Sequence, residues 1–230
     1  MAHLVASKAG SILAIDADPN SCFAEALGVT RPETIVGTCE EISKAMDKIP
    51  SGMTKERYIE MRVQESVTEC EGFDLLVMGR PEGPGCYCYV NSLLRSVIDK
   101  LASGYDYVVI DNAAGMEHIS RRTMGGVNKL VMVSDYSVPG IRSTKRIYEL
   151  AKELKIKIGS AYLIVNKVSG AMDAVSKEVE DTGLEFAGAV AYDESLVEWN
   201  VMNKPVYKFD GKKTLSSIDK IFNKLIGGKK

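Results

Sequence analysis

Acidic side chains follow two apolar runs of this sequence, at the positions where strands would end. Asp16 and Asp18 come after residues 11–15, and Asp111 closes the run 107–111. Carboxylate oxygens suit Mg²⁺, a hard cation that takes oxygen ligands and usually keeps several waters. An aspartate after a strand is also a common turn or helix-capping residue, so each one alone has an ordinary structural interpretation. Their joint placement favours a site for Mg²⁺.

Further polar positions follow predicted strands in the same way. A glycine at Gly115 would let a loop approach a phosphate closely and move when that phosphate leaves. Asn166 and Lys167 follow residues 161–165, and the side-chain amide of Asn166 could hydrogen-bond a purine edge. Ligands of a doubly wound sheet bind beyond the carboxyl ends of its strands. We therefore expect these residues and the aspartates at one rim.

A second kind of chemistry is indicated by two thiols. Cys86 and Cys88 stand one residue apart after a turn rich in Pro and Gly. Two thiolates fill half of a four-coordinate shell, so a second copy at a twofold axis would supply the other half. Tetrahedral geometry favours Zn²⁺ and planar geometry favours Ni²⁺. The pair could instead be packing residues or a redox pair. Burial is the expected state of the three isolated cysteines, Cys22, Cys39 and Cys70.

The elements that must position these residues alternate between strands and helices. Apolar runs rich in Val, Ile and Leu predict strands at 11–15, 73–79, 107–111, 129–134, 161–166 and 185–190. Amphipathic stretches predict helices at 90–102, 140–155 and 171–183. This order predicts an α/β fold with a mostly parallel sheet covered by helices on both faces.

The length of 230 residues predicts one α/β domain over 1–230. The polar region 31–70 is longer than a crossover needs and predicts helices inserted over one edge. A C-terminal helix is expected at 212–230, with an apolar stripe opposite lysines. Docking against the sheet explains this stripe, and so does a membrane surface. We expect docking.

Composition excludes several classes of partner. The net charge of −2 implies no general attraction to nucleic acid or acidic lipid, so we expect neither nucleic acid nor membrane as a partner. The sequence contains no apolar run long enough for a membrane span and no secretory leader pattern. Five cysteines, an odd number, argue for reduced thiols. A cytoplasmic protein is expected.

Three segments, LAIDADPN, YDYVVIDNAAGMEH and LIVNKV, resemble in this order the deviant-Walker P-loop ATPases related to MinD, ParA and the nitrogenase iron protein. CYCYVNSLLRSVI narrows the resemblance to the CooC type, the nickel-insertion ATPases that mature carbon monoxide dehydrogenase. The resemblance runs over residues 2–209. It implies that Asp18 orients attacking water, that Asp111 lies near the Mg²⁺ of bound ATP or ADP, and that Asn166 reads adenine.

The sequence departs from this family in one respect. Its members open with a strand and a glycine-rich phosphate loop containing lysine, whereas no G-x-x-x-x-G-K-[ST] occurs in these 230 residues. The N–H groups, lysine and Ser/Thr of such a loop hold phosphates and Mg²⁺. The first strand and the phosphate loop are therefore missing from the pattern, and we expect the sequence to be part of a longer natural chain.

The resemblance implies an ATP-dependent nickel-insertion accessory protein for carbon monoxide dehydrogenase, acting as a nucleotide-gated homodimer. Nucleotide state would alter the geometry of the four thiolates. Whether this chain hydrolyses ATP is left open, because the phosphate loop is absent from the pattern. One alternative is a metal-binding or scaffold protein that works without nucleotide. Another is a MinD/ParA-like positioning protein, which the cysteine pair disfavours because positioning needs no soft-metal ligands.

Overall fold

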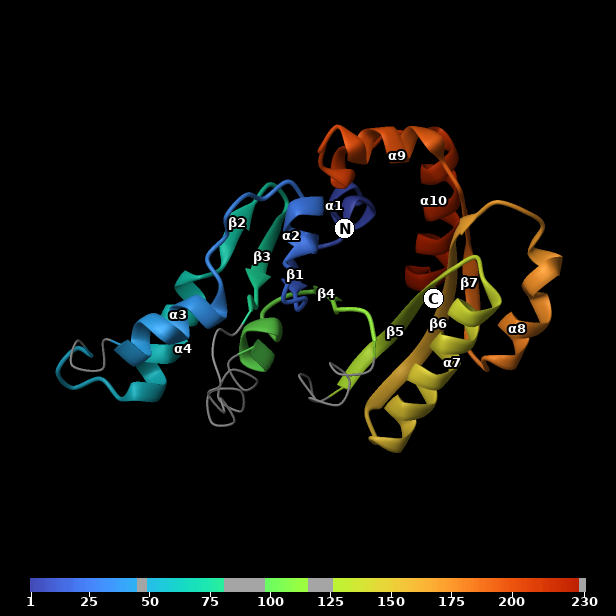
Figure 1. The fold of residues 1–230 in the computed structure, drawn as a ribbon. Helices are drawn as coiled ribbons and strands as arrows, with labels where there is room; N and C mark the ends of the chain where they lie inside the picture. The colour runs from blue at the N-terminus through green and yellow to red at the C-terminus, as the bar shows by residue number, and fades with distance from the viewer. Residues whose placement is uncertain (45–48, 81–97, 116–125, 228–230) are drawn as a thin grey trace. The chain divides into compact units, whose positions relative to one another are not determined.

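The computed structural model describes residues 1–44, 49–80, 98–115 and 126–227 (Figure 1). Contacts divide the chain into two compact units, and each is described by itself. One unit comprises Met1–Ala114 with Lys204–Lys208, and the other comprises Gly115–Asn203 with Phe209–Lys230. The single domain expected over 1–230 stays a prediction.

The first unit contains a four-stranded sheet with the order β2-β3-β1-β4. The bounds of its strands are β1 Ile12–Asp16, β2 Thr68–Cys70, β3 Phe73–Val77 and β4 Tyr107–Asp111. β1 pairs in parallel with β3 and with β4, whereas β2 pairs antiparallel with β3. Every residue of β1 is buried, as expected for a central parallel strand covered on both faces.

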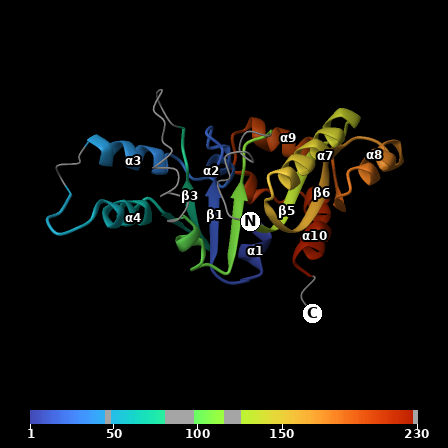
Figure 2. The same ribbon diagram turned by 90° about the horizontal axis from the view of Figure 1, so that it is seen from below.

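Helices of the first unit lie at α1 Ala2–Ala6, α2 Cys22–Ala26, α3 Ile35–Lys44 and α4 Lys55–Glu65. α3 and α4 lie side by side (Figure 2) and pack on the sheet through a shared core, in which Ile35 and Val63 contact the buried Leu13 and Leu76. α4 begins at a conventional cap, because Thr54 Oγ1 accepts from the Arg57 N–H at 3.3 Å. The region 31–70 thus holds two helices, and it ends in β2.

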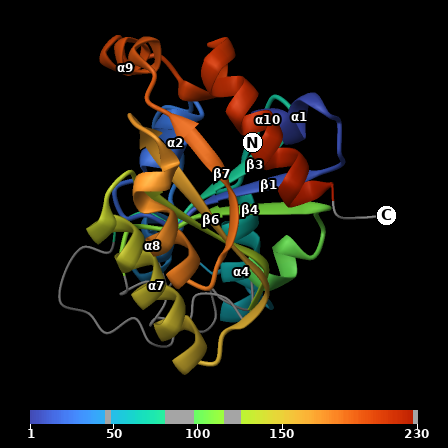
Figure 3. The same ribbon diagram turned by 90° about the vertical axis from the view of Figure 1, so that its right-hand side faces the viewer.

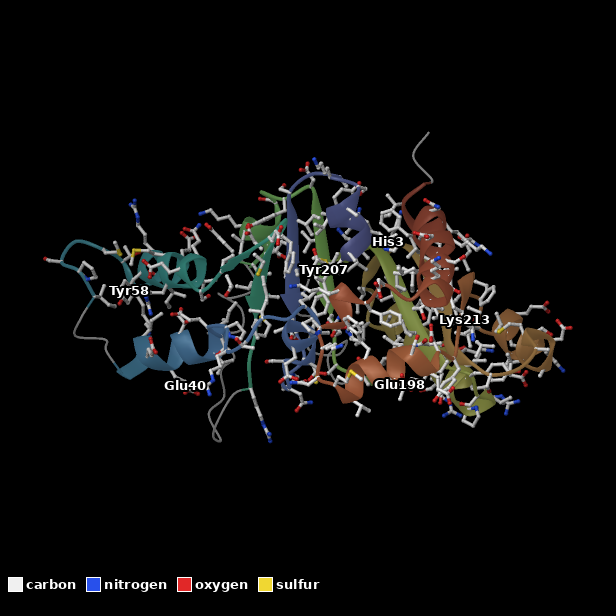
Figure 4. All side chains as sticks on the ribbon, turned by 90° about the horizontal axis from the view of Figure 1, so that it is seen from above. His3, Glu40, Tyr58, Glu198, Tyr207 and Lys213 are labelled. Atoms are coloured by element: carbon white, nitrogen blue, oxygen red, sulfur yellow. The ribbon has the colours of Figure 1, made fainter. Side chains whose placement is uncertain are left out.

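A later segment also belongs to this unit. The 3₁₀ turn at Val206–Lys208 places Tyr207 edge-on against Phe73 of β3, with ring centroids 5.7 Å apart (Figure 4). Pro205 lies against Gly28, which has φ +79, so that a Cβ at this glycine would be 2.9 Å from Pro205 Cγ. The chain therefore returns to the first unit for a few residues before its C-terminal helix.

The second unit contains a three-stranded parallel sheet with the order β5-β6-β7. Its strands are β5 Gly126–Asp135, β6 Lys157–Val168 and β7 Glu185–Ala191. Its helices are α7 Val138–Glu153, α8 Ser176–Asp181, α9 Glu194–Val201 and α10 Lys212–Ile226, with a 3₁₀ turn at Met172–Val175. The alternation of parallel strands and helices confirms the predicted α/β fold.

Helices cover both faces of this sheet (Figure 3). α7 and α8 pack on one face through Ile141 and Val179, and α10 packs on the other through Ile221. Lys213 of α10 (Figure 4) also donates to the Tyr192 carbonyl at 2.8 Å. The expected docking of the C-terminal helix on its own sheet is therefore confirmed. Within the described parts of the chain, no helix has both the length and the apolar character that a membrane crossing needs.

Candidate functional site

The first unit brings the three predicted aspartates together at the carboxyl ends of two neighbouring strands. β1 and β4 run in parallel, and Asp16 pairs in register with Asp111. The ladder continues one residue further, because the Ala17 N–H donates to the Asp111 carbonyl at 2.8 Å. Asp18 follows directly in the loop after β1. This is the end of a parallel sheet where ligands bind.

The loop after β1 is shaped by its own polar residues. Pro19 fixes its φ and so favours a turn after Asp18. Asp18 Oδ1 accepts from the Asn20 N–H at 2.8 Å, and the Asp18 carbonyl accepts from the Ser21 N–H at 3.0 Å. Ser21 takes a left-handed conformation, with φ 54, directly before α2. These bonds fix the backbone that carries the Asp18 carboxylate.

Asp16 lies in a different environment from the other two carboxylates. It is fully buried, with 0% of its surface exposed. Its Oδ1 accepts from the Asp18 N–H at 3.2 Å, and its Oδ2 accepts from the Ala24 N–H at 2.9 Å. Each oxygen of this buried carboxylate is therefore bonded to backbone, as burial of a charge requires.

Asp111 is exposed at the end of β4, yet its carboxyl group is electrostatically strained. Desolvation of the carboxyl group, and then the negative charges of Asp16 and Asp18, raise its pKa above the ordinary 3.8. Like charges close together disfavour ionisation, and a cation would relieve that repulsion. The residues present thus fit a cation held near Asp18 and Asp111.

The same carboxylates act on a neighbouring thiol. Cys22, the first residue of α2, is exposed, so the burial expected for it from the sequence is wrong. Desolvation, and then Asp18, Glu25 and the other nearby carboxylates, raise the pKa of this thiol. Cys22 therefore stays protonated at neutral pH and is a poor metal ligand, because coordination requires the thiolate. Cys70 is half-buried.

A complete metal centre is not present in the described part of the chain. No three His, Cys, Asp or Glu side chains there are grouped so that they could hold an ion. At this site the oxygens of Asp16 are bonded to the loop backbone. Two carboxylates with several waters suit Mg²⁺ bound together with a phosphate ligand, since Mg²⁺ is usually held in that way. Asp18 and Asp111 are the residues that would contact it or its waters.

Gly115 is a position where only glycine fits the backbone without strain. Its φ is +103, and a Cβ added there would meet nothing within 4 Å. The glycine is thus needed for the turn of the chain and not for close packing. It is the first residue of the second unit, and the residues that follow it lie outside the described part.

Asn166 and Lys167 lie in the second unit, near the end of β6. The backbone is irregular here, because the register between β6 and β7 shifts between Val165 and Val168. Lys167 takes a left-handed conformation with φ 56, and its N–H donates to Asn166 Oδ1 at 2.9 Å. The amide oxygen of Asn166 thus supports its own turn, which leaves the NH₂ group as the donor available to a ligand.

Asp135 is a further polar residue at this end of the β5-β6-β7 sheet, and it was not predicted from the sequence. Asp135 ends β5 in register with Asn166, and its Oδ1 accepts from Ser137 Oγ at 2.8 Å. Ser137 caps α7 by accepting from the Gly140 N–H at 3.1 Å. A Cβ at Gly140 would overlap Asp135 Oδ1, so this glycine is required for close approach. The segment SDYSVPG could have indicated this site, because polar residues follow an apolar run directly and a Pro stands at the second position of the next helix.

The predicted metal-binding pair, Cys86 and Cys88, falls outside the described residues. The four-thiolate site therefore remains a prediction from the sequence.

Comparison with known proteins gives relatives that span most of the chain, among them the following two. An uncharacterized ATP-binding protein of Methanocaldococcus jannaschii is 38% identical over 229 residues, which cover 98% of this chain and 90% of the relative. The carbon monoxide dehydrogenase accessory protein CooC of Rhodospirillum rubrum is 25% identical over 207 residues, which cover 85% of this chain and 78% of CooC. No protein-family model matches the sequence.

The fold is similar to that of a solved cell-division protein. The MinD protein of Aquifex aeolicus superposes with a TM-score of 0.66 at 18% identity, covering 100% of this chain and 89% of MinD. At this identity the match concerns the fold alone, and it agrees with the parallel sheets and flanking helices described above.

Proposed function

Because the chain belongs to the MinD/ParA/CooC superfamily of ATPases, we propose that it is a nucleotide-gated nickel-insertion accessory protein for carbon monoxide dehydrogenase. The observation that carries the nucleotide part is the placement of Asp16, Asp18 and Asp111 at the carboxyl ends of β1 and β4. The nickel part is supported by the similarity to CooC and by Cys86 and Cys88. We place the protein in the cytoplasm, where thiols stay reduced.

In this proposal the two carboxylates that are not fully buried, Asp18 and Asp111, have separate roles. Asp18 accepts a hydrogen bond from the water that attacks the terminal phosphate and so orients it. Asp111 holds a water of the Mg²⁺ shell at the end of β4. A bound Mg²⁺ supplies charge neutralisation for the phosphate oxygens.

Two predicted positions of the second unit, Gly115 and Asn166, have roles of their own in this proposal. Gly115 gives its loop the freedom to follow the terminal phosphate, as its left-handed backbone allows. The Asn166 NH₂ group donates to the base, and the strained turn at Lys167 holds it in place.

The cysteine pair would carry the nickel cargo. Cys86 and Cys88 from each of two copies give four thiolates, which is the complete shell that Ni²⁺ or Zn²⁺ needs. Each copy supplies half of the ligands across a twofold axis, so the metal site exists only in the homodimer. A change of nucleotide state alters the dimer, and with it the geometry of the thiolates, so that the ion is loaded or released.

Metal stoichiometry and mass test this proposal together. The full chain is titrated with NiCl₂, and with ZnCl₂ in parallel, under reducing conditions, while sedimentation equilibrium reports its mass. We expect one ion for two chains and a dimer that forms with the metal. The Cys86→Ser, Cys88→Ser double variant should remain monomeric and bind no ion at the same concentrations.

A matched control removes a thiol that lies away from the pair. Cys70 is half-buried in β2, and its Sγ is 3.6 Å from the Thr68 carbonyl. Cys70→Ser should therefore keep the dimer and the metal. The nickel part is refuted if the wild-type chain stays monomeric with both metals, or if the double variant binds as much metal as wild type.

ATP turnover separates the proposal from its alternatives. Hydrolysis is measured for the 230-residue chain and for a version extended at its start by a strand and a phosphate loop. Turnover in either supports the nucleotide-gated protein. Metal binding with turnover in neither supports a scaffold that works without nucleotide. A membrane-positioning protein is disfavoured by α10, since its apolar stripe is buried on β7.

A further inference from the structure

The buried carboxylate of Asp16 acts on the loop that contains Asp18. Its two oxygens bond two different backbone N–H groups, those of Asp18 at 3.2 Å and of Ala24 at 2.9 Å. These donors lie on either side of the turn that includes Pro19 and Ser21. One fully buried side chain therefore fixes both ends of the loop.

The bond to Ala24 also replaces a missing helix cap. Ser21 is the N-cap residue of α2, but its backbone is left-handed and its side chain makes no cap bond. Ala24 is the third residue of α2, and its N–H is one of the donors that an N-cap side chain normally satisfies. Asp16 provides this acceptor from the end of β1, so the strand and the helix share one carboxylate.

The geometry leaves Asp16 unsuited to bind a ligand itself. Both Asp16 oxygens accept from loop N–H groups, and the side chain has 0% exposure, so it offers no accessible surface to an ion or a nucleotide. Asp18 is less buried and Asp111 is exposed at the same end of the sheet. The three carboxylates are thus divided between one that is fully buried and supports the loop and two that are not fully buried.

We propose that Asp16 is a positioning residue, which holds the Asp18 carboxylate in place through the loop backbone and contacts neither nucleotide nor metal. This inference rests on the proposed nucleotide site for its functional meaning. Its structural content is independent of that site, because it concerns two hydrogen bonds that are made without any ligand.

Amide hydrogen exchange of the full chain, without ligand, tests the structural content. Asp16→Asn keeps the side-chain volume but places an NH₂ group against one of the two N–H donors, and Asp16→Ala removes both acceptors. Loss of a helix cap of ordinary strength predicts exchange about tenfold faster at the Asp18 and Ala24 amides. Unchanged exchange at both amides in both variants would overturn the proposal.

Asp106 offers a matched control at the other end of the same strands. Its Oδ2 accepts from the Ser11 N–H at 2.8 Å and from Ser11 Oγ at 2.9 Å, which ties the start of β4 to the start of β1. Asp106→Asn also weakens two bonds to an aspartate in this sheet. It should leave exchange at Asp18 and Ala24 within twofold of wild type.

The functional content is tested by a double-mutant cycle on ATP hydrolysis, in whichever form of the chain turns over. Asp16→Ala should lower kcat about tenfold and leave KM for Mg·ATP within twofold. In the Asp18→Ala background it should have no further effect, because both changes remove one function. Additive losses, or a raised requirement for Mg²⁺ in Asp16→Asn, would overturn the positioning role. Absence of turnover in every form refutes the proposed nucleotide function, while the exchange result still decides whether Asp16 positions the loop.

Discussion

The docking of α10 on the second sheet buries the apolar side chain of Ile221, and this gives a prediction with a calculable size. Ile221 is 4% exposed and packs with Tyr162, Ala187 and Val190. Gly188 of β7 lies directly beneath it, because a Cβ there would be 2.6 Å from Ile221 Cγ1. Ile221→Ala removes the three carbon atoms that fill this space.

The expected loss follows from the buried carbon atoms. At about 0.8 kcal/mol for each buried methylene-sized group, their transfer accounts for about 2.4 kcal/mol. The cavity left on rigid β7 adds to this, so the free energy of unfolding should fall by about 2–4 kcal/mol. For a chain of this size, that corresponds to a Tm lower by roughly 4–16 °C.

The one tryptophan of the chain reports on this unit. Trp199 of α9 stacks edge-on against Phe209, with ring centroids 5.7 Å apart. Urea unfolding followed by its fluorescence therefore measures the stability of the second unit. Val201→Ala is the control, because that side chain is 82% exposed and its truncation should change stability by less than about 0.5 kcal/mol.

A second substitution makes the test specific for docking. Gly188→Ala should destabilise the protein, because its new methyl group overlaps Ile221. Combined with Ile221→Ala, it should cost less than the sum of the two single changes, because alanine at 221 leaves room for the methyl group. Additive costs would refute the contact between α10 and β7. If Ile221→Ala left stability unchanged and weakened binding to anionic liposomes, the apolar stripe would belong to a membrane surface.

Two further predictions concern ionisable groups of the first unit. Desolvation and the charges of Asp16 and Asp18 raise the pKa of Asp111, so the ionised carboxylate destabilises the folded protein. Asp111→Asn should therefore raise the Tm at pH 7. This gain should vanish as the pH falls below about 3.8, where the carboxyl group is protonated in both the folded and the unfolded chain. Burial, the 2.6 Å bond to Asp74 and its charge raise the pKa of Tyr105 to about 12. The phenolate absorbance of one tyrosine should therefore appear near pH 12 and be missing in Tyr105→Phe. Below about pH 10, Tyr105→Phe should lower the free energy of unfolding by about 1 kcal/mol. This difference should shrink as the pH rises through about 12.

The strands were predictable because they are continuous apolar runs. β4 has the predicted bounds 107–111, and β1 differs by one residue at each end. β5 extends over Gly126–Asp135, beyond the predicted 129–134, because main-chain pairing with β6 continues past the apolar residues. Hydrophobic pattern marks where a strand is buried, whereas its hydrogen-bond partner decides where it ends.

Elements without an apolar pattern were missed for a physical reason. β2 is only Thr68–Cys70 and has no buried residue, so nothing in its composition distinguishes it from a loop. It forms because Gly72, with φ +85, turns the chain back so that β2 pairs with β3. A Cβ at Gly72 would be 2.6 Å from Val5 Cγ1. α9 likewise has no buried residue. Both elements depend on contacts distant in sequence or on turn geometry.

The candidate site was predictable as a group of carboxylates but not as a division of roles. The sequence predicted that Asp16, Asp18 and Asp111 lie at one end of a sheet. The register of β1 with β4 brings them to that end. The sequence analysis assigned Asp16 to cofactor binding. That assignment stays a prediction. The Asp16 oxygens accept from two backbone N–H groups, one of which is six residues beyond Asp18. No local pattern encodes that bond, because it depends on how the loop folds back over the strand end.

Local structure that opposes stability recurs at the positions the motifs indicate. Asp111 has a raised pKa because like charges surround it, and Ser21 and Lys167 take left-handed conformations that cost non-glycine residues energy. Lys8, Lys155 and Asn203 are left-handed too, but each follows the end of a helix, where that conformation closes the last turn. Arg31, between α2 and α3, is left-handed as well. Ser21 and Lys167 have no such explanation, since one precedes a helix and the other interrupts a strand. Strain of this kind persists where the surrounding core enforces it, and it is typical of ligand sites. The fully buried β1 and the pairing of β6 with β5 can enforce it, so the backbone conformations of Ser21 and Lys167 are compatible with the candidate positions.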